Sequence, residues 1–595
     1  MTGKLWPAPW PARRTIVISI VTLSVALLAC AAWVGVRGLL AKTELENAET
    51  RLSAIRSAVI TGDIAGAQKL STRLSAETAA ASGYTSDVVW RSCEWLPWVG
   101  PNLTATRSVA TIIDEVDRDA VVPLVRVASS VHLRDFHPVN GAIDLAPLAV
   151  LQPVVAKAAH ALLLAQQQTR NITTDSTADS VRRAVGRLDT TLQTAVTALS
   201  SVDRTLRLLP PMLGAKGPRN YLVLFQTPAE LRASGGITGA LAVIHTENGR
   251  ISLAAQATSG DFPHHPQPVL ALPAETSALY GDIVGEFIQD VGLTPNFSLT
   301  AQLAREMWRL RYGITVDGVI TADPVALSYL LNATGPIVLP SGERLTSANA
   351  VKLLLSDVYH RFVKPSDQDK FFASAAAAVF GELAKGKPDS VALVKAMGRA
   401  GTERRILIWS AHPEEQAVLT DTTFAGGLPV STAKAKRFGV YFNDATGAKM
   451  DRYLSLTTGV TKVECRKDHR PQYNVRVTLT NTLPVNEVNS LPEYVSGGAL
   501  FGVPLGSVKT LISVYGAPDT TSLSVSRDGA PTGYRPTLDT GYPVNSVGIQ
   551  LAPGQSTELV FSWLGKAPFS GQILTEGNPV ENSNLLVTRG NMCVV

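Results

Sequence analysis

The segment from Thr15 to Val36, TIVISIVTLSVALLACAAWVGV, contains no charged residue and constrains the fold more than any other part of the chain. A helix of about 20 apolar residues is long enough to cross the hydrocarbon core of a bilayer. The run is longer than the apolar core of an ordinary signal peptide, and the small residues around Cys30 are followed by further apolar residues. We therefore predict a retained transmembrane helix over 15–36, with a cleaved signal peptide as the alternative.

The basic residues beside this segment predict its orientation. Three precede it and two follow it: Lys4, Arg13 and Arg14, then Arg37 and Lys42. Lys and Arg concentrate on the cytoplasmic side of a membrane span. We therefore expect a cytoplasmic tail over 1–14, a single pass through the cell membrane and an external C-terminal part.

Length and charge limit the class of protein. A chain of 595 residues is too long for one hydrophobic core, and about 150 residues per domain predicts three or four domains. The net charge of +5 is spread along the chain without a basic run, so nothing indicates nucleic-acid binding. The excess is too small to identify any other partner, and protein partners stay unknown.

Two of the four cysteines flank the last region of the chain. Disulfides persist outside the cytoplasm, so a Cys465–Cys593 disulfide is one interpretation, and two buried free thiols are the other. The sequence contains neither a Cys-x-x-Cys pair nor a Cys/His cluster of the kind that binds a metal.

Three regions follow the membrane segment. Residues 37–210 carry apolar residues at helical spacing, which predicts an all-α helical bundle that serves as a stalk. Residues 218–430 alternate between strand and helix patterns, which predicts an α/β domain. Residues 438–595 contain short strand candidates separated by turn residues, which predicts a β-sandwich. The predicted fold class is therefore multidomain: a transmembrane helix, a helical stalk, an α/β domain and a C-terminal β-sandwich.

The strands of the α/β domain can be located from their apolar runs. They are predicted at Tyr221–Phe225, Ile237–His245, Ile251–Ala257, Gly318–Ala322 and Ile406–Ser410.

A polar stretch separates the first two of these strands. Residues 226–236, QTPAELRASGG, form what we call the elbow. Arg232 could bind a phosphate while Gly235 and Gly236 let a ligand approach the backbone. Alternatively, an ion pair between Glu230 and Arg232 could fasten the turn, and both interpretations stay open here.

Several motifs in and beyond the elbow resemble a known family. They are Leu224–Gly236, Pro295–Phe297, Asp317–Ile320, Thr334–Pro336 and Gly439–Asp444. In these motifs the chain resembles a bacterial, largely actinobacterial, family of membrane-anchored proteins known as a domain of unknown function (number four thousand and twelve). The resemblance extends from about residue 218 to the C-terminus, and it names no reaction.

A second, more distant resemblance concerns the order of motifs in the α/β domain. The matching stretches are Asp317–Ile320, Thr334–Ile337, Tyr359–Arg361 and Asp367–Lys370. Their order is similar to that of the LytR-CpsA-Psr domain, whose members attach glycopolymers from polyprenyl-pyrophosphate carriers to the bacterial wall. This resemblance implies a LytR-CpsA-Psr-like fold, with Arg361, Asp367 and Lys370 as candidate catalytic residues.

The chain departs from that domain at two charged positions. The stretch Ala257–Pro263 contains Asp261 but lacks the arginine that contacts the pyrophosphate in the family. The position of a second family arginine is occupied by Lys370, which carries charge but cannot form the two parallel hydrogen bonds of a guanidinium. A site with these departures could bind without reacting.

The other candidate residues each have a functional and a structural interpretation. Asp261, beside His264 and His265, could hold Mg²⁺ or act as a base, or lie in an exposed loop. Asn296 could contact a substrate or satisfy a turn, and Asp367 could act in catalysis or cap a helix.

The sequence therefore predicts a membrane-anchored cell-envelope protein that binds or transfers a polyprenyl-linked anionic glycopolymer. In this hypothesis Arg232, Arg361 and Lys370 neutralise phosphate charge, and Glu230, Gly235, Gly236 and Asn296 complete the substrate site. The alternative is a non-catalytic envelope scaffold or binding protein in which the same charges are structural ties.

Overall fold

The structure is a computed structural model that describes residues 12–128, 141–384, 390–567, 569 and 571–586. It separates into two compact units. A helical unit comprises the chain up to Pro210, and a second unit begins at Pro211 and takes in the short segment 141–144. The segment 141–144 joins the second unit through a bridge between Ala142 and Arg250.

The helical unit contains seven α-helices in its described residues: α1 (Ala12–Thr61), α2 (Ile64–Thr85), α3 (Val88–Cys93), α4 (Gly100–Val116), α5 (Val122–Ala128), α6 (Ala146–Arg170) and α7 (Asp179–Met212). A π-helical stretch, Asp117–Val121, joins α4 to α5. Small apolar side chains such as Ala158 and Ala165 on α6 pack against Leu192 and Val196 on α7.

The first helix contains the predicted membrane segment. α1 has 50 residues, and the most apolar window of its described part has none of its side chains buried. It is long and apolar enough to cross a membrane, as a membrane anchor or signal sequence would be. α6 passes the same test of length and composition, but a third of its window is buried within the bundle.

The second unit begins with a mixed sheet of five strands. In spatial order these are β3 (Arg250–Thr258), β2 (Gly235–Glu247), β1 (Arg219–Arg232), β4 (Gly318–Ala322) and β7 (Ile406–Ser410). β1 and β4 run parallel, whereas the other neighbouring pairs run antiparallel. All five strands predicted from the sequence are therefore present.

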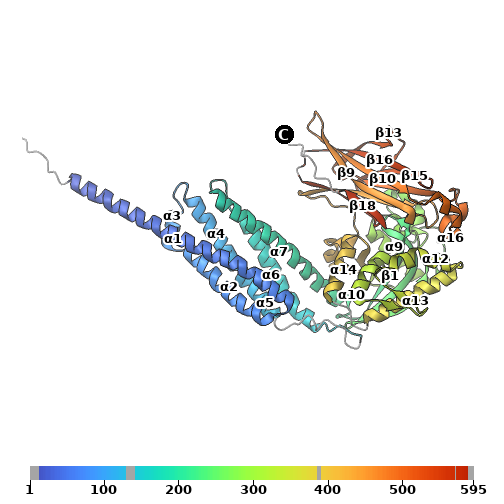
Figure 1. Cartoon of the computed structure of the whole chain (residues 1–595), viewed down its shortest axis with the longest axis horizontal. Helices are drawn as coiled ribbons and strands as arrows, with labels where there is room; N and C mark the ends of the chain where they lie inside the picture. Colours follow the sequence, from blue (N-terminus) through green and yellow to red (C-terminus); the bar gives the residue numbers. More distant parts are fainter. Residues whose placement is uncertain (1–11, 129–140, 385–389, 568, 570, 587–595) are drawn as a thin grey trace, which may run out of the picture. The chain divides into compact units, whose positions relative to one another are not determined.

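Helices lie between or after these strands in the chain, and Figure 1 labels α9, α10, α12, α13 and α14 near β1. They are α8 (Ala274–Tyr280), α9 (Phe297–Tyr312), α10 (Pro324–Thr334), α11 (Ala350–Lys352), α12 (Val358–Arg361), α13 (Pro365–Ala384), α14 (Ser390–Thr402) and α15 (Pro413–Thr420). A two-stranded sheet of β5 (Ile337–Val338) and β6 (Arg344–Leu345) lies between α10 and α11 in the chain. Met307 and Trp308 on α9 are fully buried against Leu222 and Leu224 on β1, which places one hydrophobic core on this side.

Two further sheets form the C-terminal part. The larger contains β13 (Ala530–Pro531), β12 (Thr520–Arg527), β16 (Ser556–Gly565), β10 (Pro471–Asn481), β9 (Leu454–Cys465) and β18 (Asn582–Leu586). The smaller contains β14 (Arg535–Asp539), β15 (Tyr542–Leu551), β11 (Val508–Tyr515), β8 (Ala435–Asp444) and β17 (Gln572–Gly577). Alternate residues of β10 are buried, as expected for a strand with one face in a core.

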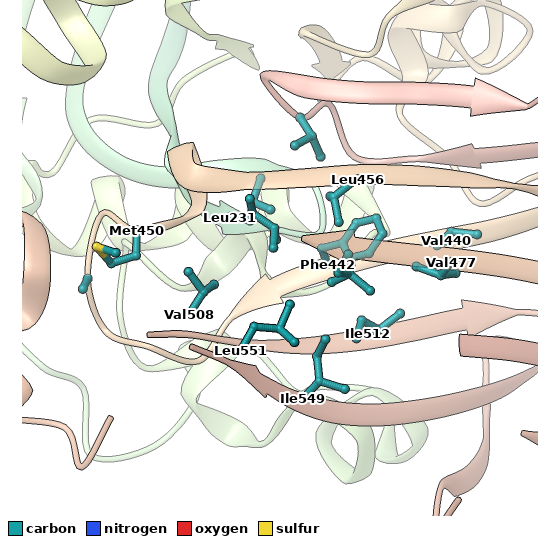
Figure 2. Close-up of a cluster of buried hydrophobic side chains, with 14 of the residues drawn as sticks. Leu231, Val440, Phe442, Met450, Leu456, Val477, Val508, Ile512, Ile549 and Leu551 are labelled. Carbon is teal, nitrogen blue, oxygen red and sulfur yellow. The ribbon is translucent and has the colours of Figure 1, made fainter. Parts of the chain in front are cut away.

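The two C-terminal sheets share a core, which also includes the elbow. Figure 2 shows Val477 of the larger sheet among Phe442 and Ile512 of the smaller one, with Leu231 from the end of β1 beside them. The same cluster includes Phe371 on α13. The α/β part and the C-terminal sheets of the second unit thus both contribute side chains to this cluster.

The predicted multidomain fold class is confirmed: a long apolar N-terminal helix, a helical region, a mixed α/β sheet and C-terminal β-sheets. The domain boundaries proposed above stay predictions. The elbow differs from expectation in one respect, because Glu230 and Arg232 belong to β1 rather than to a turn between strands.

Candidate functional site

The elbow is an irregular end of a strand pair. The pairing of β1 with β2 shifts register between Phe225 and Gln226, and again between Thr227 and Leu231. Gly235 has φ of +144°, a conformation that favours glycine, and a Cβ there would collide with the Gln226 side chain. A Cβ at Gly236 would collide with the backbone carbonyl of Thr227. The two glycines therefore let the strands approach each other at the bulge.

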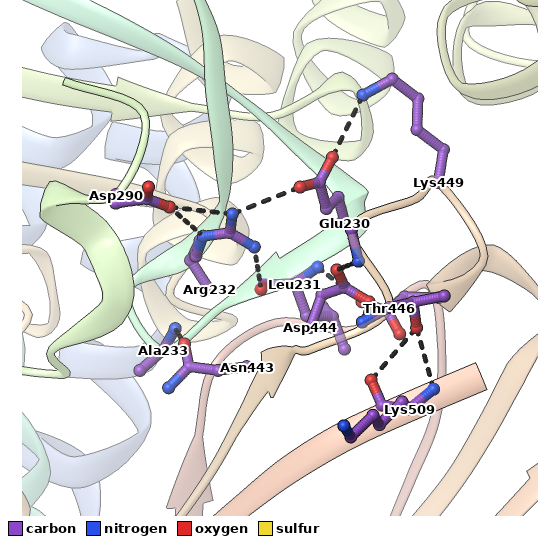
Figure 3. A network of polar contacts seen from close by, with 12 residues as sticks. Glu230, Leu231, Arg232, Ala233, Asp290, Asn443, Asp444, Thr446, Lys449 and Lys509 are labelled. Carbon is purple, nitrogen blue, oxygen red and sulfur yellow. Dashed lines mark hydrogen bonds and ion pairs between the residues drawn. The ribbon is translucent and has the colours of Figure 1, made fainter. Parts of the chain in front are cut away.

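Arg232 is enclosed by internal partners (Figure 3). Its Nη2 donates to Asp290 Oδ1 at 2.9 Å and to Glu230 Oε1 at 3.2 Å, and its Nε donates to the same Asp290 oxygen at 3.1 Å. The remaining nitrogen, Nη1, donates to the carbonyl of Leu231 at 3.0 Å. Only 8% of the side chain is exposed. The guanidinium therefore has a protein partner on each nitrogen.

A lysine on the far side of Glu230 extends this network. Lys449 Nζ donates to Glu230 Oε2 at 3.4 Å. Its ammonium lies over two aromatic rings, 5.4 Å from the centroid of Tyr359 and 5.1 Å from that of Tyr494. Such cation–π contacts stabilise a charge that has been removed from water. Tyr359 belongs to α12, so the network joins the α/β part to the C-terminal sheets.

The backbone of the elbow is also held by side chains from the C-terminal part. The amide of Leu231 donates to Asp451 Oδ2 at 2.7 Å, and the amide of Ala233 donates to Asn443 Oδ1 at 2.8 Å. Asn578 donates from its Nδ2 to the carbonyl of Arg232 at 3.2 Å. We call these residues, together with Glu230, Asp290, Asp444 and Lys449, the junction network.

Acidic groups outnumber basic ones in the junction network. Four carboxyl groups face two cations: Glu230, Asp290, Asp444 and Asp451, then Arg232 and Lys449. Burial, reinforced by the charge of Glu230, raises the pKa of Asp444 to about 6. Burial and the neighbouring Asp444 raise the pKa of Asp451 well above its ordinary value. Burial also raises the pKa of Asp290, even though Arg232 opposes this shift.

The cations of the network stay charged despite burial. Burial alone would lower the pKa of Lys449, but the neighbouring Tyr359 and Glu230 raise it overall. Burial likewise opposes the charge of Arg232, and Glu230 and Asp290 more than compensate, so its pKa is raised. The junction network can therefore keep its two cations charged and let its neighbouring carboxyl groups share protons.

The three candidate catalytic residues lie on the surface of α12 and α13. Arg361, at the end of α12, forms an ion pair with Glu343. Lys370 pairs with Asp367 one turn away on α13, at 3.2 Å between Nζ and Oδ1. The Lys370 side chain is 78% exposed. These groups are open to solvent, whereas Arg232 is sealed, so the structure does not present Arg232 beside them at one open surface.

Asp261 ends a short helical turn, Ser259–Asp261, and Asn296 precedes the first residue of α9. Asp261 Oδ2 accepts hydrogen bonds from the amide of Thr258 at 2.7 Å and from its hydroxyl at 3.1 Å. Asn296 caps α9, since its Oδ1 accepts from the amide of Leu299 at 3.4 Å. His264 stacks on the ring of Phe287, with ring centroids 4.4 Å apart. Across the described ranges no three His, Cys, Asp or Glu residues lie in a group that could hold a metal ion.

Among the described cysteines one is disulfide-bonded and two are free. Cys465, at the end of β9, is disulfide-bonded. Its predicted partner, Cys593, lies outside the described residues. Cys30 and Cys93 are free.

Two acidic residues at the ends of β4 have separate arginine partners. Asp317 lies 3.6 Å from Arg219 and contacts His412 Nε2 at 2.9 Å. At the other end Asp323 lies 2.8 Å from Arg405 and is buried. No local sequence pattern predicts the pair of Asp323 and Arg405, because the two residues are 82 positions apart.

A groove of about 570 Å³ in the helical unit, lined by both polar and apolar groups, was not predicted from the sequence. Hydroxyl and amide groups of α4 and of the end of α6, including Thr104, Thr111, Gln168 and Asn171, line it. These residues alternate with core residues on helices, and helical spacing alone does not distinguish a groove wall from an exposed face.

Comparisons with known proteins cover part of the second unit. Residues 216–359 match the family model described as Protein of unknown function (DUF4012). The predicted resemblance to this family is confirmed for that region, which includes Glu230, Arg232 and Asp290, and its extension to the C-terminus stays a prediction. No curated protein matches the chain.

One solved structure that the chain resembles is the transcriptional regulator yvhJ from Bacillus subtilis. The identity is 12%, and the alignment covers 36% of this chain and 81% of that chain, with a TM-score of 0.21. At this score the likeness carries no argument about function.

Proposed function

We propose that the protein is a single-pass, membrane-anchored component of the bacterial cell envelope that binds an anionic, polyprenyl-linked glycopolymer without transferring it. α1 serves as the anchor, with a short cytoplasmic N-terminus and the second unit outside. The order of motifs similar to the LytR-CpsA-Psr domain supports a glycopolymer as the ligand. The geometry favours binding of the glycopolymer over its transfer.

The observation that carries this choice is the enclosure of Arg232. Transfer from a pyrophosphate carrier requires cations aimed at the charge that develops on the phosphate. Arg232 has every guanidinium nitrogen engaged by Glu230, Asp290 or the Leu231 carbonyl. Freeing it would leave the buried carboxylate of Asp290 without its arginine partner and Glu230 with Lys449 alone, and breaking a buried pair costs about 3–5 kcal/mol. Arg232 therefore serves as a tie within the protein.

Arg361 and Lys370 are the groups that we assign to ligand contact. Their present partners, Glu343 and Asp367, hold them in exposed ion pairs. An exposed pair contributes only about 0–1 kcal/mol, so a polymer phosphate can displace the carboxylate at little cost. Mg²⁺ at Asp261 is a further prediction that belongs to the transfer hypothesis.

The full-length protein, reconstituted in nanodiscs, allows binding and transfer to be measured separately. A fluorescent polyprenyl-pyrophosphate oligosaccharide should bind, and Arg361→Ala/Lys370→Ala should weaken binding about tenfold, or 1.4 kcal/mol, at an unchanged melting temperature. Arg309→Ala is the matched control, because this exposed arginine forms a comparable surface pair with Glu306 on α9. Equal loss in the control would mean non-specific charge attraction.

The same preparation with Mg²⁺ and an acceptor glycan tests transfer. We expect the carrier to remain intact, with and without Mg²⁺. Release of polyprenyl pyrophosphate at a rate that Arg361→Ala abolishes would establish the enzyme hypothesis instead. Absence of binding to any polyprenyl-linked or free anionic polymer would leave only the scaffold alternative.

A further inference from the structure

The segment 87–99, DVVWRSCEWLPWV, lies beside the place where the apolar part of α1 ends. Arg37 Nη1 lies 2.8 Å from Asp87 Oδ2, and Trp33 Nε1 donates to the same oxygen at 3.4 Å. Arg37 is the first charged residue after the apolar run that ends at Val36. The segment, which we call the tryptophan loop, is thus fastened at the level where the predicted span leaves the membrane.

A buried tryptophan fixes the orientation of the tryptophan loop. Trp90 is 1% exposed, and its ring packs against α1 at Gly38, where an added Cβ would lie 3.6 Å from the ring. Its Nε1 donates to the carbonyl of Leu103 at 3.2 Å. The loop is therefore clamped between α1 and α4 rather than attached at one point.

The turn that follows is also held in place. Arg107 Nε on α4 contacts Glu94 Oε1 at 2.6 Å, and its Nη2 contacts Glu94 Oε2 at 3.0 Å. Gly100 packs against the Glu94 carbonyl so closely that a side chain at this position would collide with it. These contacts set the direction in which the residues between Glu94 and Gly100 project.

The side chains that project are large and apolar. Trp95 is 77% exposed and Trp98 is 88% exposed, and Val88 and Val99 are exposed nearby. Trp98 has φ of +67°, a conformation that a bulky residue rarely adopts. Two tryptophans are therefore exposed on the protein surface, one of them in a strained conformation, whereas Trp90 of the same segment is buried.

We propose that the tryptophan loop is a second membrane contact, in which Trp95 and Trp98 insert into the headgroup region of the phospholipid bilayer that α1 crosses. Tryptophan favours this region because its ring is apolar and its N–H can reach water or a lipid carbonyl. Trp33 on α1 and the exposed cation Arg91 lie in or beside the same segment and suit the same boundary.

The tryptophan loop is continuous with the apolar part of α1, and we therefore propose lipid rather than a protein as its partner. Because the loop is fastened to α1 at Trp33 and Arg37, a bilayer around the span necessarily reaches it. Two contacts at one membrane surface would restrict the tilt of the helical unit. This inference rests on the membrane anchoring that forms part of the proposed function, and it does not depend on a glycopolymer.

Depth-dependent quenching tests the proposal in the full-length protein. Cys30→Ser/Cys93→Ser removes the free thiols, and single cysteines at Trp98, Trp95, Leu23 or Thr61 are then labelled with the polarity-sensitive fluorophore NBD. Each variant is reconstituted in vesicles of phosphatidylcholine and phosphatidylglycerol containing lipids that carry a nitroxide. Leu23 reports the span, and Thr61, about 37 Å beyond Val36 along a continuous helix, reports water.

We expect blue-shifted, lipid-quenched emission at Trp98 and Trp95, strongest quenching by nitroxides near the headgroup, and no quenching at Thr61. Quenching at Leu23 with none at Trp98 or Trp95 would overturn the inference and leave the anchor intact. A blue shift at Trp98 without lipid quenching would also overturn it, since a protein surface would then cover the loop. Absence of quenching at Leu23 would remove the anchor itself, and the proposed function with it.

The labelled variants should fold normally. Because Trp95 and Trp98 are mostly exposed, replacing either one removes little buried contact, and the melting temperature should be unchanged. Trp90→Cys is the contrasting variant: it would lower the melting temperature because its ring is buried.

Discussion

The amide of Leu231 donates a 2.7 Å hydrogen bond to the carboxylate of Asp451, which lies 220 positions later in the chain. The bond is buried, and the other oxygen of Asp451 has no hydrogen-bond partner among the described residues. It joins the end of β1 to the segment that leads into β9. The junction network is therefore where the α/β part and the C-terminal sheets depend on each other.

Arg232→Ala should destabilise the second unit strongly. The substitution leaves the buried carboxylate of Asp290 without its arginine partner and leaves Glu230 with Lys449 alone, and breaking a buried pair in this way costs about 3–5 kcal/mol. Thermal and urea unfolding of the full-length protein in detergent, followed by near-ultraviolet circular dichroism, would measure the loss. Arg309→Ala, which removes an exposed pair, should leave unfolding unchanged. Similar curves for both variants would show that the junction network does not hold the unit together.

The stability of the second unit should decrease as pH rises from about 4 to about 6. Asp444 has its folded pKa raised to about 6, whereas an unperturbed aspartate titrates near 3.9. The folded state therefore binds the proton more tightly, and its advantage is complete below the unfolded pKa and lost as pH passes the folded pKa. Asp451, whose pKa is also raised, acts in the same direction.

Asp451→Asn provides the matched variant for this pH dependence. The amide oxygen can still accept the hydrogen bond from Leu231, but the buried charge is gone. Urea unfolding at pH 5 and pH 7 should then differ less than in the unmodified protein. A variant that keeps the full difference would place the responsible proton elsewhere.

Gly236→Ala should destabilise the second unit by about 1–3 kcal/mol, the usual cost of overpacking at a rigid site. An added Cβ would lie 2.3 Å from the Thr227 carbonyl oxygen, which is backbone and cannot rotate away. Gly239→Ala on the same strand is the control, because no atom lies within 4 Å of its added Cβ. Equal melting temperatures for the two variants would mean that the bulge relaxes freely.

Peptide mapping should detect the disulfide of Cys465. We expect a peptide containing Cys465 to be linked to one containing Cys593 under non-reducing conditions and released by reduction, as the sequence-based pairing predicts. Cys30 and Cys93 serve as internal controls and should react with a thiol reagent before reduction, since both are free. Reaction of Cys465 in the unreduced, denatured protein would contradict the assignment.

Local sequence patterns were sufficient to predict the strands but not the partners of the elbow. Apolar runs such as Tyr221–Phe225 indicate a buried strand because the signal repeats within a few residues. The elbow was recognisable too, since Glu-x-Arg followed by two glycines is unusual between strands. Asp290 and Lys449 were not, because they come from 58 and 219 positions away, and no local periodicity carries that information.

The position of β8 illustrates the same limit. In the sequence, Gly439–Asp444 stands out only through a family resemblance and not through a strand pattern. In the structure, β8 lies between β11 and β17 in the smaller sheet. A central strand carries apolar residues on both faces, so the alternation that marks a half-exposed strand is absent: all but two of its residues are buried.

The last described strands, β17 and β18, each form one edge of a C-terminal sheet. β17 pairs in parallel with β8, and β18 pairs in parallel with β9. Asn578, between them, holds the Arg232 carbonyl. A nascent chain emerging from the ribosome therefore exposes two unpaired strand edges and an unfinished elbow until β17, Asn578 and β18 have been synthesised. Premature termination near residue 570 would yield a protein that aggregates rather than a shorter functional one.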